Sequence, residues 1–248
     1  MGIENKLAVV TGSASGIGKA IAEAMAAAGA KVIVADVARE GGEAVAAAIR
    51  GAGGKAEYRH LDLTDPPSIE AFASALQNDA GAVDIIVNNA GWGRAAPFVE
   101  GTLDFWNKMV ALNFVGPMAL VKALLPGMTQ RTGGRIVNIA SDAGRVGSMG
   151  ETVYSGTKGA LIAFTKSLAR EVARYQISVN CVCPGPTDTP LMNAVPDKLK
   201  DALVKAIPFR RLGKPEEVAA AVVFFAGDGA SYITGQVVSV SGGLTMAG

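Results

Sequence analysis

The stretch VVTGSASGIGKAIA, residues 9–22, places three glycines between a short apolar run and an alanine-rich amphipathic segment. The apolar run predicts a buried strand and the amphipathic segment predicts a helix, so Gly12, Gly16 and Gly18 lie in the connection between them. Glycines there let the backbone approach a pyrophosphate closely, and the amides and dipole at the helix N-terminus favour an anion. Glycine-rich connections also serve packing alone, so this loop leaves dinucleotide binding and packing about equally open.

The alternation of strand and helix continues along the chain. Strands are expected at 7–10, 31–36, 56–62, 83–89, 134–141, 178–183 and 237–243, and the longer helices lie near 66–79, 102–126 and 153–174. The strands are rich in Val and Ile and lack polar alternation, which indicates a parallel sheet buried on both faces by helices. The pattern therefore predicts the α/β class, with a doubly wound, Rossmann-like parallel sheet of about seven strands.

No linker, charge block or repeat divides the 248 residues, and we expect a single domain over residues 1–248. The least regular stretch is 186–213, which is rich in Pro and other helix breakers. In a doubly wound fold such a segment is a candidate substrate lid, and a plain loop-helix excursion is the alternative.

Composition argues against several classes of protein. The formal net charge is only +1, so no basic surface for nucleic acid is expected. The first residues lack the apolar core of a signal peptide, and no apolar run approaches the roughly 20 residues of a membrane span. We therefore expect a cytoplasmic protein that has no membrane partner.

The histidine and cysteine content limits the chemistry further. His60 is the single histidine, it is expected to end a strand, and multi-histidine metal sites are excluded. Cys181 and Cys183 stand two apart on a predicted strand without suitable disulfide geometry, so we expect core thiols, with metal binding by the C-x-C pair as the alternative. No metal cofactor is predicted.

Asp36 ends the second predicted strand, at about the distance where a carboxylate can accept hydrogen bonds from the adenosine ribose hydroxyls of a dinucleotide. The same carboxylate would repel a 2'-phosphate, and neither Ser15 nor Val37 brings a positive charge to neutralise that phosphate, although Arg39 is near. The sequence therefore predicts NAD rather than NADP. A turn-forming Asp at a strand end is the alternative.

Five motifs stand in one order along the chain: TGSASGIG (11–18), NNAG (88–91), Ser141, YSGTK (154–158) and PGPTDT (184–189). Together they resemble the short-chain dehydrogenase/reductase family from about residue 5 to the end of the sequence. The glycine spacing and the length are similar to the compact single-domain branch of that family. The resemblance implies a nicotinamide-dependent oxidoreductase that acts on CH-OH groups.

The resemblance also implies a catalytic tetrad of Asn113, Ser141, Tyr154 and Lys158. Tyr154 would be the general acid-base, Lys158 would lower the pKa of Tyr154 and hold the nicotinamide ribose, and Ser141 would bond the reacting oxygen. Asn113 would interrupt a helix and hold a water that leads from Lys158 to solvent. With Tyr154 and Lys158, the implied cofactor-binding residues are Gly12, Ser15, Gly16, Ile17, Gly18, Asp36, Asp62, Leu63, Asn89, Ala90, Gly91, Pro184, Gly185, Thr187 and Thr189.

The spacing of Tyr154 and Lys158 agrees with this chemistry, because positions i and i+4 share one face of a helix. A free tyrosine has a pKa of about 10, whereas a nearby ammonium and the positive charge of an oxidised nicotinamide favour the phenolate. We therefore expect Tyr154 to exchange the hydroxyl proton while a hydride moves between substrate and nicotinamide. Taken singly, the pair could be an exposed helix pair, and a non-catalytic NAD-binding protein is the remote alternative.

Loops that should face the site carry two large apolar residues and four arginines: Trp92, Met149, Arg94, Arg145, Arg210 and Arg211. We expect Trp92, Arg94, Ser141, Arg145 and Met149 to contact the substrate. Apolar groups beside arginines suit an apolar ring or acyl chain on an anionic carrier, although any single arginine could equally be solvated or cap a helix.

The stretches NNAGW, IVNIASDAGRVGSMGETVY and VCPGPTDT resemble 2-hydroxycyclohexanecarboxyl-CoA dehydrogenases, and thinner stretches are similar to 3-oxoacyl-carrier-protein reductases and secondary-alcohol dehydrogenases. The leading hypothesis is NAD-dependent oxidation of a cyclic or short 3-hydroxyacyl-CoA. A free secondary or cyclic alcohol and a 3-oxoacyl-carrier-protein are the alternative substrates. The resemblance also implies a homotetramer that pairs the helices near 102–126 and 153–174.

Overall fold

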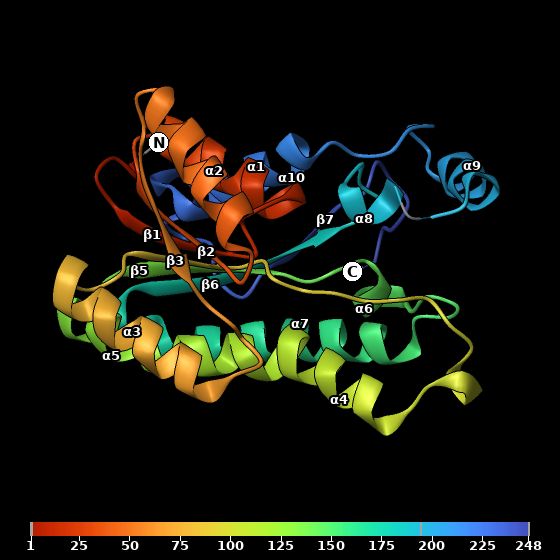
Figure 1. The fold of residues 1–248 in the computed structure, drawn as a ribbon, viewed down its shortest axis with the longest axis horizontal. Coiled ribbons are helices and arrows are strands. Elements are labelled where there is room, and N and C mark those ends of the chain that lie inside the picture. The colour runs from red at the N-terminus through yellow and green to blue at the C-terminus, as the bar shows by residue number, and fades with distance from the viewer. Residues whose placement is uncertain (1, 194, 248) are drawn as a thin grey trace.

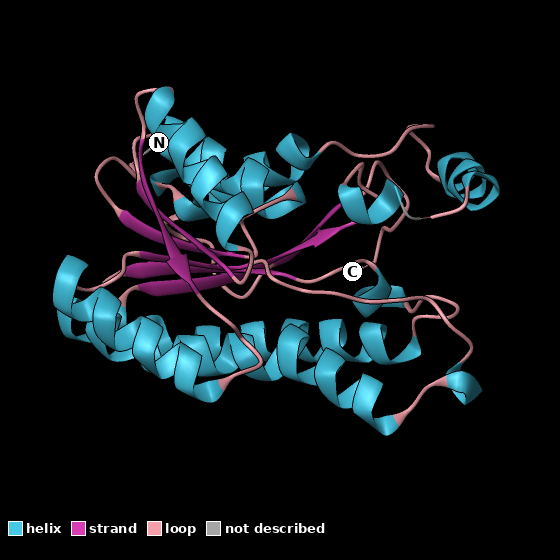
Figure 2. Ribbon diagram, in the orientation of Figure 1, coloured by secondary structure: helices cyan, strands magenta, loops and turns pink. Residues whose placement is uncertain are grey.

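The computed structural model, described for residues 2–193 and 195–247, is built around one sheet of seven parallel strands (Figures 1 and 2). The strands are β1 Leu7–Thr11, β2 Lys31–Asp36, β3 Lys55–His60, β4 Ile85–Asn88, β5 Gly134–Ile139, β6 Ile177–Pro184 and β7 Val237–Val240. Their order in the sheet is β3-β2-β1-β4-β5-β6-β7. The direction of winding reverses between β1 and β4. In sheets of this kind a ligand binds at that point, in the crevice outside the carboxyl ends of the strands. The predicted doubly wound fold is confirmed.

The burial of the strands follows their place in the sheet. Every residue of the central strands β1, β4 and β6 is buried, whereas the edge strands β3 and β7 are partly exposed. A central parallel strand packs against helices on both faces, which is why these segments read as continuous Val/Ile-rich runs.

Two layers of helices cover the sheet, as Figure 1 shows, and α6, α8 and α9 lie to the right in that view. The helices are α1 Gly16–Ala27, α2 Arg39–Gly51, α3 Pro66–Ala80, α4 Leu103–Val110, α5 Gly116–Arg131, α6 Ala143–Val146, α7 Thr152–Val172, α8 Pro190–Asn193, α9 Asp197–Ala206 and α10 Pro215–Ala226. One layer contains α1, α2 and α10, and the other contains α3, α4, α5 and α7. The sheet and its two helix layers place the carboxyl ends of the strands beside α6 and α8.

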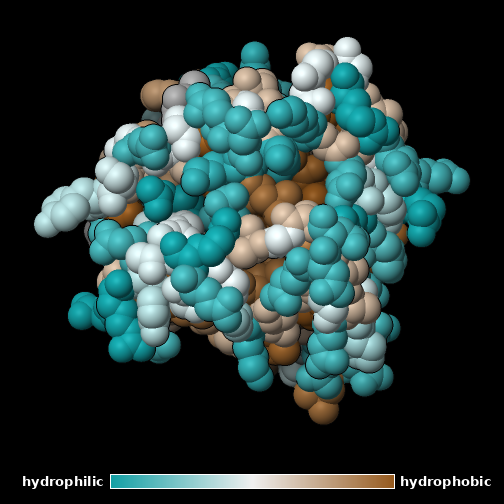
Figure 3. Space-filling view, turned by 90° about the vertical axis from the view of Figure 1, so that its left-hand side faces the viewer, coloured by the Kyte–Doolittle hydropathy of each residue, from teal (hydrophilic) through white to brown (hydrophobic). Residues whose placement is uncertain are grey.

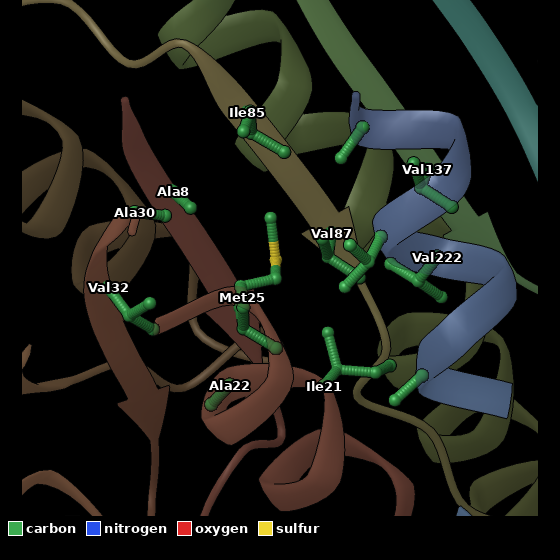
Figure 4. Packing of buried hydrophobic residues seen from close by; sticks show 14 of the residues in the cluster. Ala8, Ile21, Ala22, Met25, Ala30, Val32, Ile85, Val87, Val137 and Val222 are labelled. Carbon is green, nitrogen blue, oxygen red and sulfur yellow. The ribbon is translucent and has the colours of Figure 1, made fainter. Parts of the chain in front are cut away.

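Side chains from several elements meet in each layer. In Figure 4, Ile21 and Met25 of α1 point toward Val87 of β4 and Val222 of α10, and all four belong to one buried cluster. Figure 3 views the molecule from the side on the left in Figure 1, where hydrophilic residues cover most of the surface around a hydrophobic strip. Amphipathic helices produce this arrangement, because only one face of each can pack on the sheet.

Local signals in the sequence start two of the helices in the second layer. Asp65 caps α3 by accepting a hydrogen bond from the Ser68 amide at 3.2 Å, and Pro66 occupies the first turn. Thr102 caps α4 in the same way, through the Phe105 amide at 3.3 Å. Such caps satisfy amides that would otherwise have no partner at the start of a helix.

α4 and α5 form one continuous helix, Leu103–Arg131, through a π-helical turn at Ala111–Val115. By length and composition alone this 29-residue helix could cross a membrane. The sequence expectation concerned unbroken apolar runs, and charged residues such as Lys108 and Lys122 interrupt this one. In the fold, its Leu120 and Leu124 are buried in the same cluster as strand residues.

The segment 186–213 contains the short helices α8 and α9, which lie to the right in Figure 1. No residue of α9 is buried, and Leu191 and Leu199 expose more than half and half of their surface, respectively. Both predicted alternatives, a lid and a plain loop-helix excursion, contain such exposed short helices. The action of the segment as a lid stays a prediction.

Candidate active site

The glycine loop after β1 has a conformation that only glycine adopts easily. Gly12 and Gly16 have φ of 63° and 55°, in the left-handed region. A Cβ added to Gly18 would lie 2.1 Å from the Gly12 carbonyl oxygen, and one added to Gly12 would lie 2.7 Å from the Ala90 Cα. The loop is therefore packed directly against the segment that follows β4.

Thr11 and Asn89 fasten these two segments together. The Thr11 hydroxyl oxygen accepts from the amides of Asn89 and Ala90, both at 3.0 Å. The Asn89 side chain donates to the carbonyls of Thr11 at 2.9 Å and Gly12 at 3.1 Å. The glycine loop and the NNAG motif therefore form one hydrogen-bonded unit at the point where the winding of the sheet reverses.

The start of α1 suits an anion. Ser15 precedes the helix without a side-chain cap, and the first turn, which contains Ile17, has no acidic residue. The amides and the positive end of the helix dipole can therefore bind a negatively charged ligand. A Cβ on Gly16 would lie 3.7 Å from Thr189, so the loop after β6 bounds the same space. These features fit the pyrophosphate of a dinucleotide.

The loop after β6 is held by its own side chains. Pro184 ends the buried strand β6, and the Gly185 amide donates to the Val240 carbonyl at 3.0 Å. The hydroxyl of the buried Thr187 donates to the Gly185 carbonyl at 2.9 Å, and the Thr189 hydroxyl donates to the Thr187 carbonyl at 3.4 Å. Both hydroxyls keep acceptor lone pairs, so their contact with a cofactor stays a prediction.

Asp36 lies at the end of β2 with its carboxylate held beside the glycine loop. One oxygen accepts from the Ala14 amide and the other from the Ala38 amide, both at 2.9 Å. The guanidinium carbon of Arg39 lies 5.6 Å from the centre of the Tyr58 ring, and the Tyr58 hydroxyl donates to the Asp36 carbonyl at 3.0 Å. Arg39 therefore stacks on Tyr58, and Asp36 makes only amide contacts with its carboxylate.

Asp62 and Leu63 follow β3, on the same edge of the sheet. One Asp62 oxygen accepts from the Thr64 amide at 2.8 Å and from the Thr64 hydroxyl at 2.7 Å, so this carboxylate stabilises its own turn. Leu63 is buried, and a Cβ on Gly116 would lie 2.3 Å from the Leu63 carbonyl oxygen. The predicted adenine contacts of both residues remain predictions.

Tyr154 and Lys158 lie one turn apart on α7, above the segment that follows β4. The Lys158 amine is 5.8 Å from the centre of the Tyr154 ring and donates to the Ile139 carbonyl at 2.8 Å. A Cβ on Gly91 would lie 2.9 Å from the Lys158 amine, and one on Gly93 would lie 2.7 Å from the Tyr154 ring. Only glycine fits under each of these two side chains without a shift of the structure.

Asn113 lies in the π-helical turn and is fully buried. Its side-chain oxygen accepts from the Trp92 amide at 2.8 Å, and its side-chain nitrogen donates to the Trp92 carbonyl at 2.7 Å. The same nitrogen reaches the Thr157 hydroxyl at 3.4 Å. Asn113 therefore fixes the backbone at Trp92 in both directions, and its predicted water-holding role stays a prediction.

Ser141 follows β5, and its hydroxyl oxygen accepts from the Ala143 amide at 3.1 Å. That bond occupies a lone pair and leaves the hydroxyl proton free to be donated. The Ser141 side chain lies close enough to Tyr154 to act to lower the pKa of Tyr154. That both hydroxyls bond one substrate oxygen stays a prediction.

Burial governs the protonation of the catalytic pair. It raises the pKa of Tyr154 to about 12, against the smaller opposing effect of Ser141, and it lowers the pKa of Lys158 to about 8. In the chain alone, burial raises the pKa of Tyr154, so the lowering of that pKa by Lys158 stays a prediction. Both charged forms lose hydration, and the Lys158 amine is bonded to Ile139.

Three of the predicted substrate contacts have other neighbours, and a fourth is exposed. The Trp92 ring meets the Phe105 ring edge-on at 5.3 Å, and the guanidinium carbon of Arg94 lies 4.9 Å from the centre of the Phe105 ring. Met149 is fully exposed. Arg145 donates to the Ser239 hydroxyl at 2.8 Å and to the Ala247 carbonyl. Both terminal nitrogens of Arg145 are therefore bonded within the chain, and its contact with the substrate stays a prediction.

The remaining two arginines are also engaged. Arg211 makes two hydrogen bonds to the Glu217 carboxylate, at 2.7 and 2.6 Å, and Arg210 donates to the Lys205 carbonyl. These contacts weaken the argument that the loop arginines bind an anionic carrier of the substrate.

Cys181 and Cys183 are buried free thiols with their sulfur atoms 3.9 Å apart, in a small cluster with Ala140. The core position expected for them is confirmed. Over residues 2–193 and 195–247, no group of three His, Cys, Asp or Glu side chains is placed to hold a metal ion.

Several residues that organise the site received no role from the sequence. Thr11 and Gly93 lie inside or beside the recognised motifs, so their position was the available signal. Asn138 has no such signal in the sequence. It accepts a hydrogen bond from the Asn88 side chain at 2.8 Å and donates one to the Thr165 hydroxyl at 2.8 Å, in the buried layer between the sheet and α7. Nothing in the sequence pairs these three side chains before the sheet register is known.

Comparison with known proteins gives a consistent picture. A family model described as enoyl-(acyl carrier protein) reductase matches residues 12–245. The 3-oxoacyl-(acyl-carrier-protein) reductases of Vibrio harveyi, Escherichia coli and Thermotoga maritima are 42%, 41% and 37% identical, and each alignment covers 99% of this chain and 100% of the relative.

A solved structure is similar over nearly its whole length. It is described as a putative NAD(P)-dependent gluconate 5-dehydrogenase from Beutenbergia cavernae with bound NADP at low occupancy. The TM-score is 0.94 at 35% identity, and the match covers 98% of each chain.

The raised pKa of Tyr154 leads to a prediction about its ionisation. Because burial holds the pKa near 12, Tyr154 should stay protonated to about pH 10 in the protein without cofactor. Saturating NAD⁺ should move the ionisation to lower pH, since a positive charge beside the phenol favours the phenolate, and NADH should not. The phenolate absorbance of the wild type minus that of Tyr154→Phe measures this directly. A phenolate already formed at about pH 8 without cofactor would contradict the assignment.

Proposed function

The chain belongs to the short-chain dehydrogenase/reductase family, and we propose that it uses NAD to interconvert a secondary alcohol and a ketone, with a cyclic or short 3-hydroxyacyl-CoA as the alcohol. The observation that carries the reaction class is the position of Tyr154 and Lys158 on one face of α7, beside Ser141 and over the backbone at Gly91. The glycine loop that suits a dinucleotide is bonded to that same backbone. Cofactor and acid-base groups therefore converge on one point.

The side chains divide the proton chemistry between them. A bound nicotinamide would supply or accept the hydride at the substrate carbon. Tyr154 donates a proton to the carbonyl oxygen in reduction and takes the hydroxyl proton in oxidation. Ser141 donates its free proton to the same oxygen, where negative charge develops. With a pKa of about 12, Tyr154 is ready as an acid, and it becomes a base only when a nearby positive charge lowers that pKa.

The proton must reach solvent from a buried pair. Lys158 is 3% exposed, and the side-chain amide of Asn113 is occupied by Trp92 and Thr157. We propose that a water leading from Lys158 bonds to the helix backbone at the π turn around Asn113, where the regular ladder of hydrogen bonds is interrupted.

The preference for NAD is argued from Asp36. Its carboxylate lies at the glycine loop, and the nearest arginine in sequence, Arg39, is stacked on Tyr58. A 2'-phosphate beside this carboxylate would meet like charge, whereas ribose hydroxyls can donate to it. The description of the similar solved structure names NADP, so the two cofactors have to be compared directly.

We expect kcat/KM with NAD⁺ to exceed that with NADP⁺ by about 100-fold, which corresponds to about 3 kcal/mol. Asp36→Ala should reduce the ratio toward 1 by removing the repulsion and the ribose contact together. Lys31→Ala, at the opposite end of β2, is the matched control and should leave the ratio unchanged. A preference for NADP⁺ in the wild type would contradict the proposal.

The substrate proposal rests on apolar surface and on the relatives. Large apolar side chains are exposed on segments that follow the strands, among them Trp92, Val146 of α6 and Leu191 of α8. The curated relatives are named for 3-oxoacyl thioesters, which places the ketone β to a thioester in those proteins. The engaged arginines favour the second candidate, a free secondary or cyclic alcohol, because they remove the charge argument for CoA.

We expect NAD reduction with 2-hydroxycyclohexanecarboxyl-CoA to show a higher kcat/KM than with cyclohexanol or a linear 3-hydroxyacyl-CoA. Tyr154→Phe should lose turnover by more than about 100-fold and still bind NADH, because only the acid-base hydroxyl is removed. NADH fluorescence measures binding, and absorbance at the NADH band measures turnover. A best rate with the free alcohol sinks the CoA proposal, a best rate with a 3-oxoacyl carrier protein favours that alternative, and turnover by Tyr154→Phe sinks the mechanism.

We also propose that the protein is a homotetramer in which α5 and α7 pair with the same helices of a second copy. An apolar groove of about 610 Å³ runs between them, lined by residues that include Val121, Leu125, Phe164 and Leu168. Filling this groove would bury side chains that otherwise face water. Sedimentation at micromolar concentration should give four times the chain mass of 25.2 kDa, and Phe164→Glu should lower it. A wild-type monomer would contradict the proposal.

A further inference from the structure

A chain of hydrogen bonds runs from the residue after Ser141 to the last described residue. The Asp142 carboxylate accepts from the Ser239 hydroxyl, whose oxygen accepts from Arg145 at 2.8 Å. The other terminal nitrogen of Arg145 donates to the Ala247 carbonyl. These contacts join β5, α6, β7 and the segment after β7, and we call them the Asp142–Ala247 relay.

The direction of each bond in the relay is fixed by the chemistry of its groups. A guanidinium can only donate and an ionised carboxylate can only accept. The Ser239 hydroxyl therefore accepts from Arg145 and gives its single proton to Asp142. Ser239 therefore lies between the positive charge of Arg145 and the carboxylate of Asp142. The hydrogen bond from Arg145 polarises the Ser239 hydroxyl and strengthens its hydrogen bond to Asp142.

The relay lies against the residue that donates to the substrate oxygen. Asp142 follows Ser141 directly, is 5% exposed, and donates its amide to the Pro184 carbonyl at 3.1 Å. Its second carboxylate oxygen is buried without a hydrogen-bond partner among the described residues. A buried carboxylate with so few partners depends strongly on each one, because desolvated charge is costly to leave unmatched.

The first turn of α6 transmits the position of the relay to Ser141. The Arg145 amide donates to the Asp142 carbonyl at 2.9 Å, and the Gly144 amide donates to the Ser141 carbonyl at 3.0 Å. A Cβ on Gly144 would lie 2.7 Å from the Lys158 carbonyl carbon, so this turn is also pressed against α7. A shift of the Arg145 end moves the Ser141 hydroxyl relative to Tyr154.

We infer that Arg145, Ser239 and Asp142 are positioning residues for Ser141 in the hydride-transfer reaction, an inference that rests on the proposed function. Arg145 holds the Asp142 loop through Ser239 and ties it to the segment that ends at Ala247. This relay determines the direction in which the Ser141 hydroxyl donates its proton to the substrate oxygen. Misplacement of a reacting group by about 1 Å is enough to slow a reaction about 100-fold.

The experiment compares Arg145→Ala and Ser239→Ala with the wild type. Each should lower kcat by about 10-fold to 100-fold, leave the Kd for NADH within about 2-fold, and raise the deuterium isotope effect at the reacting carbon, because chemistry becomes rate-limiting. The double variant should be no slower than the slower single variant, since both act through one relay. Arg145→Lys should recover part of the rate.

Arg131→Ala is the matched control. Arg131 also bonds a side chain and a carbonyl, Asp84 at 3.2 Å and Val83 at 2.8 Å, but at the amino end of the sheet. It should leave kcat and the isotope effect unchanged. An Arg145→Ala variant with wild-type kcat, or one whose kcat loss comes with lost NADH binding and no change in isotope effect, overturns the inference.

Ser141→Ala in the same assay separates the two levels of the argument. If it abolishes turnover while Arg145→Ala and Ser239→Ala do not slow it, the positioning inference fails and the proposed function stands. If Ser141→Ala turns over at the wild-type rate, the proposed role of Ser141 fails, and the positioning inference fails with it.

Discussion

The site depends on how closely the backbone after β4 passes between the glycine loop and α7. Thr11 and Asn89 bind it to the loop, Asn113 binds it to the long helix, and Gly91 lies under the Lys158 amine. A side chain at Gly91 or Gly93 would require a shift of the structure, so one short segment sets the positions of the glycine loop and of Tyr154 and Lys158. Parallel strands make this possible, because they deliver both loops to the same edge of the sheet.

The same close packing explains why the pKa of Tyr154 is raised in the chain alone, whereas a nearby ammonium would lower it. Close packing removes water from Tyr154 and Lys158, which raises one pKa to about 12 and lowers the other to about 8. Burial thereby disfavours the charged form of each group relative to water. A positive charge bound beside Tyr154 would favour its phenolate, so the proposed acid-base activity would be coupled to the occupancy of the proposed dinucleotide site.

The sequence predicted the features that depend on local chemistry and short spacing. Val/Ile runs identified the sheet, and the four-residue spacing placed Tyr154 and Lys158 on one face of α7. It did not predict features that depend on pairing across the fold. Arg145 finds its partner Ser239 across 94 positions, and the direction of the Tyr154 pKa depends on burial that only the packed layers supply. The helix expected near 102–126 is observed as Leu103–Arg131, with the π turn at Asn113.

The contacts of the loop arginines bear on where substrate selectivity can come from. A guanidinium bonded to Glu217 or Ser239 has fewer N–H donors left to hold a phosphate. Exposed apolar side chains such as Trp92 and Leu191 then supply most of the contact surface. Apolar pockets discriminate weakly between groups of similar size. With the proposed roles of Ser141 and Tyr154, selectivity would be concentrated at the reacting oxygen, and the position of the Ser141 loop would affect specificity as well as rate.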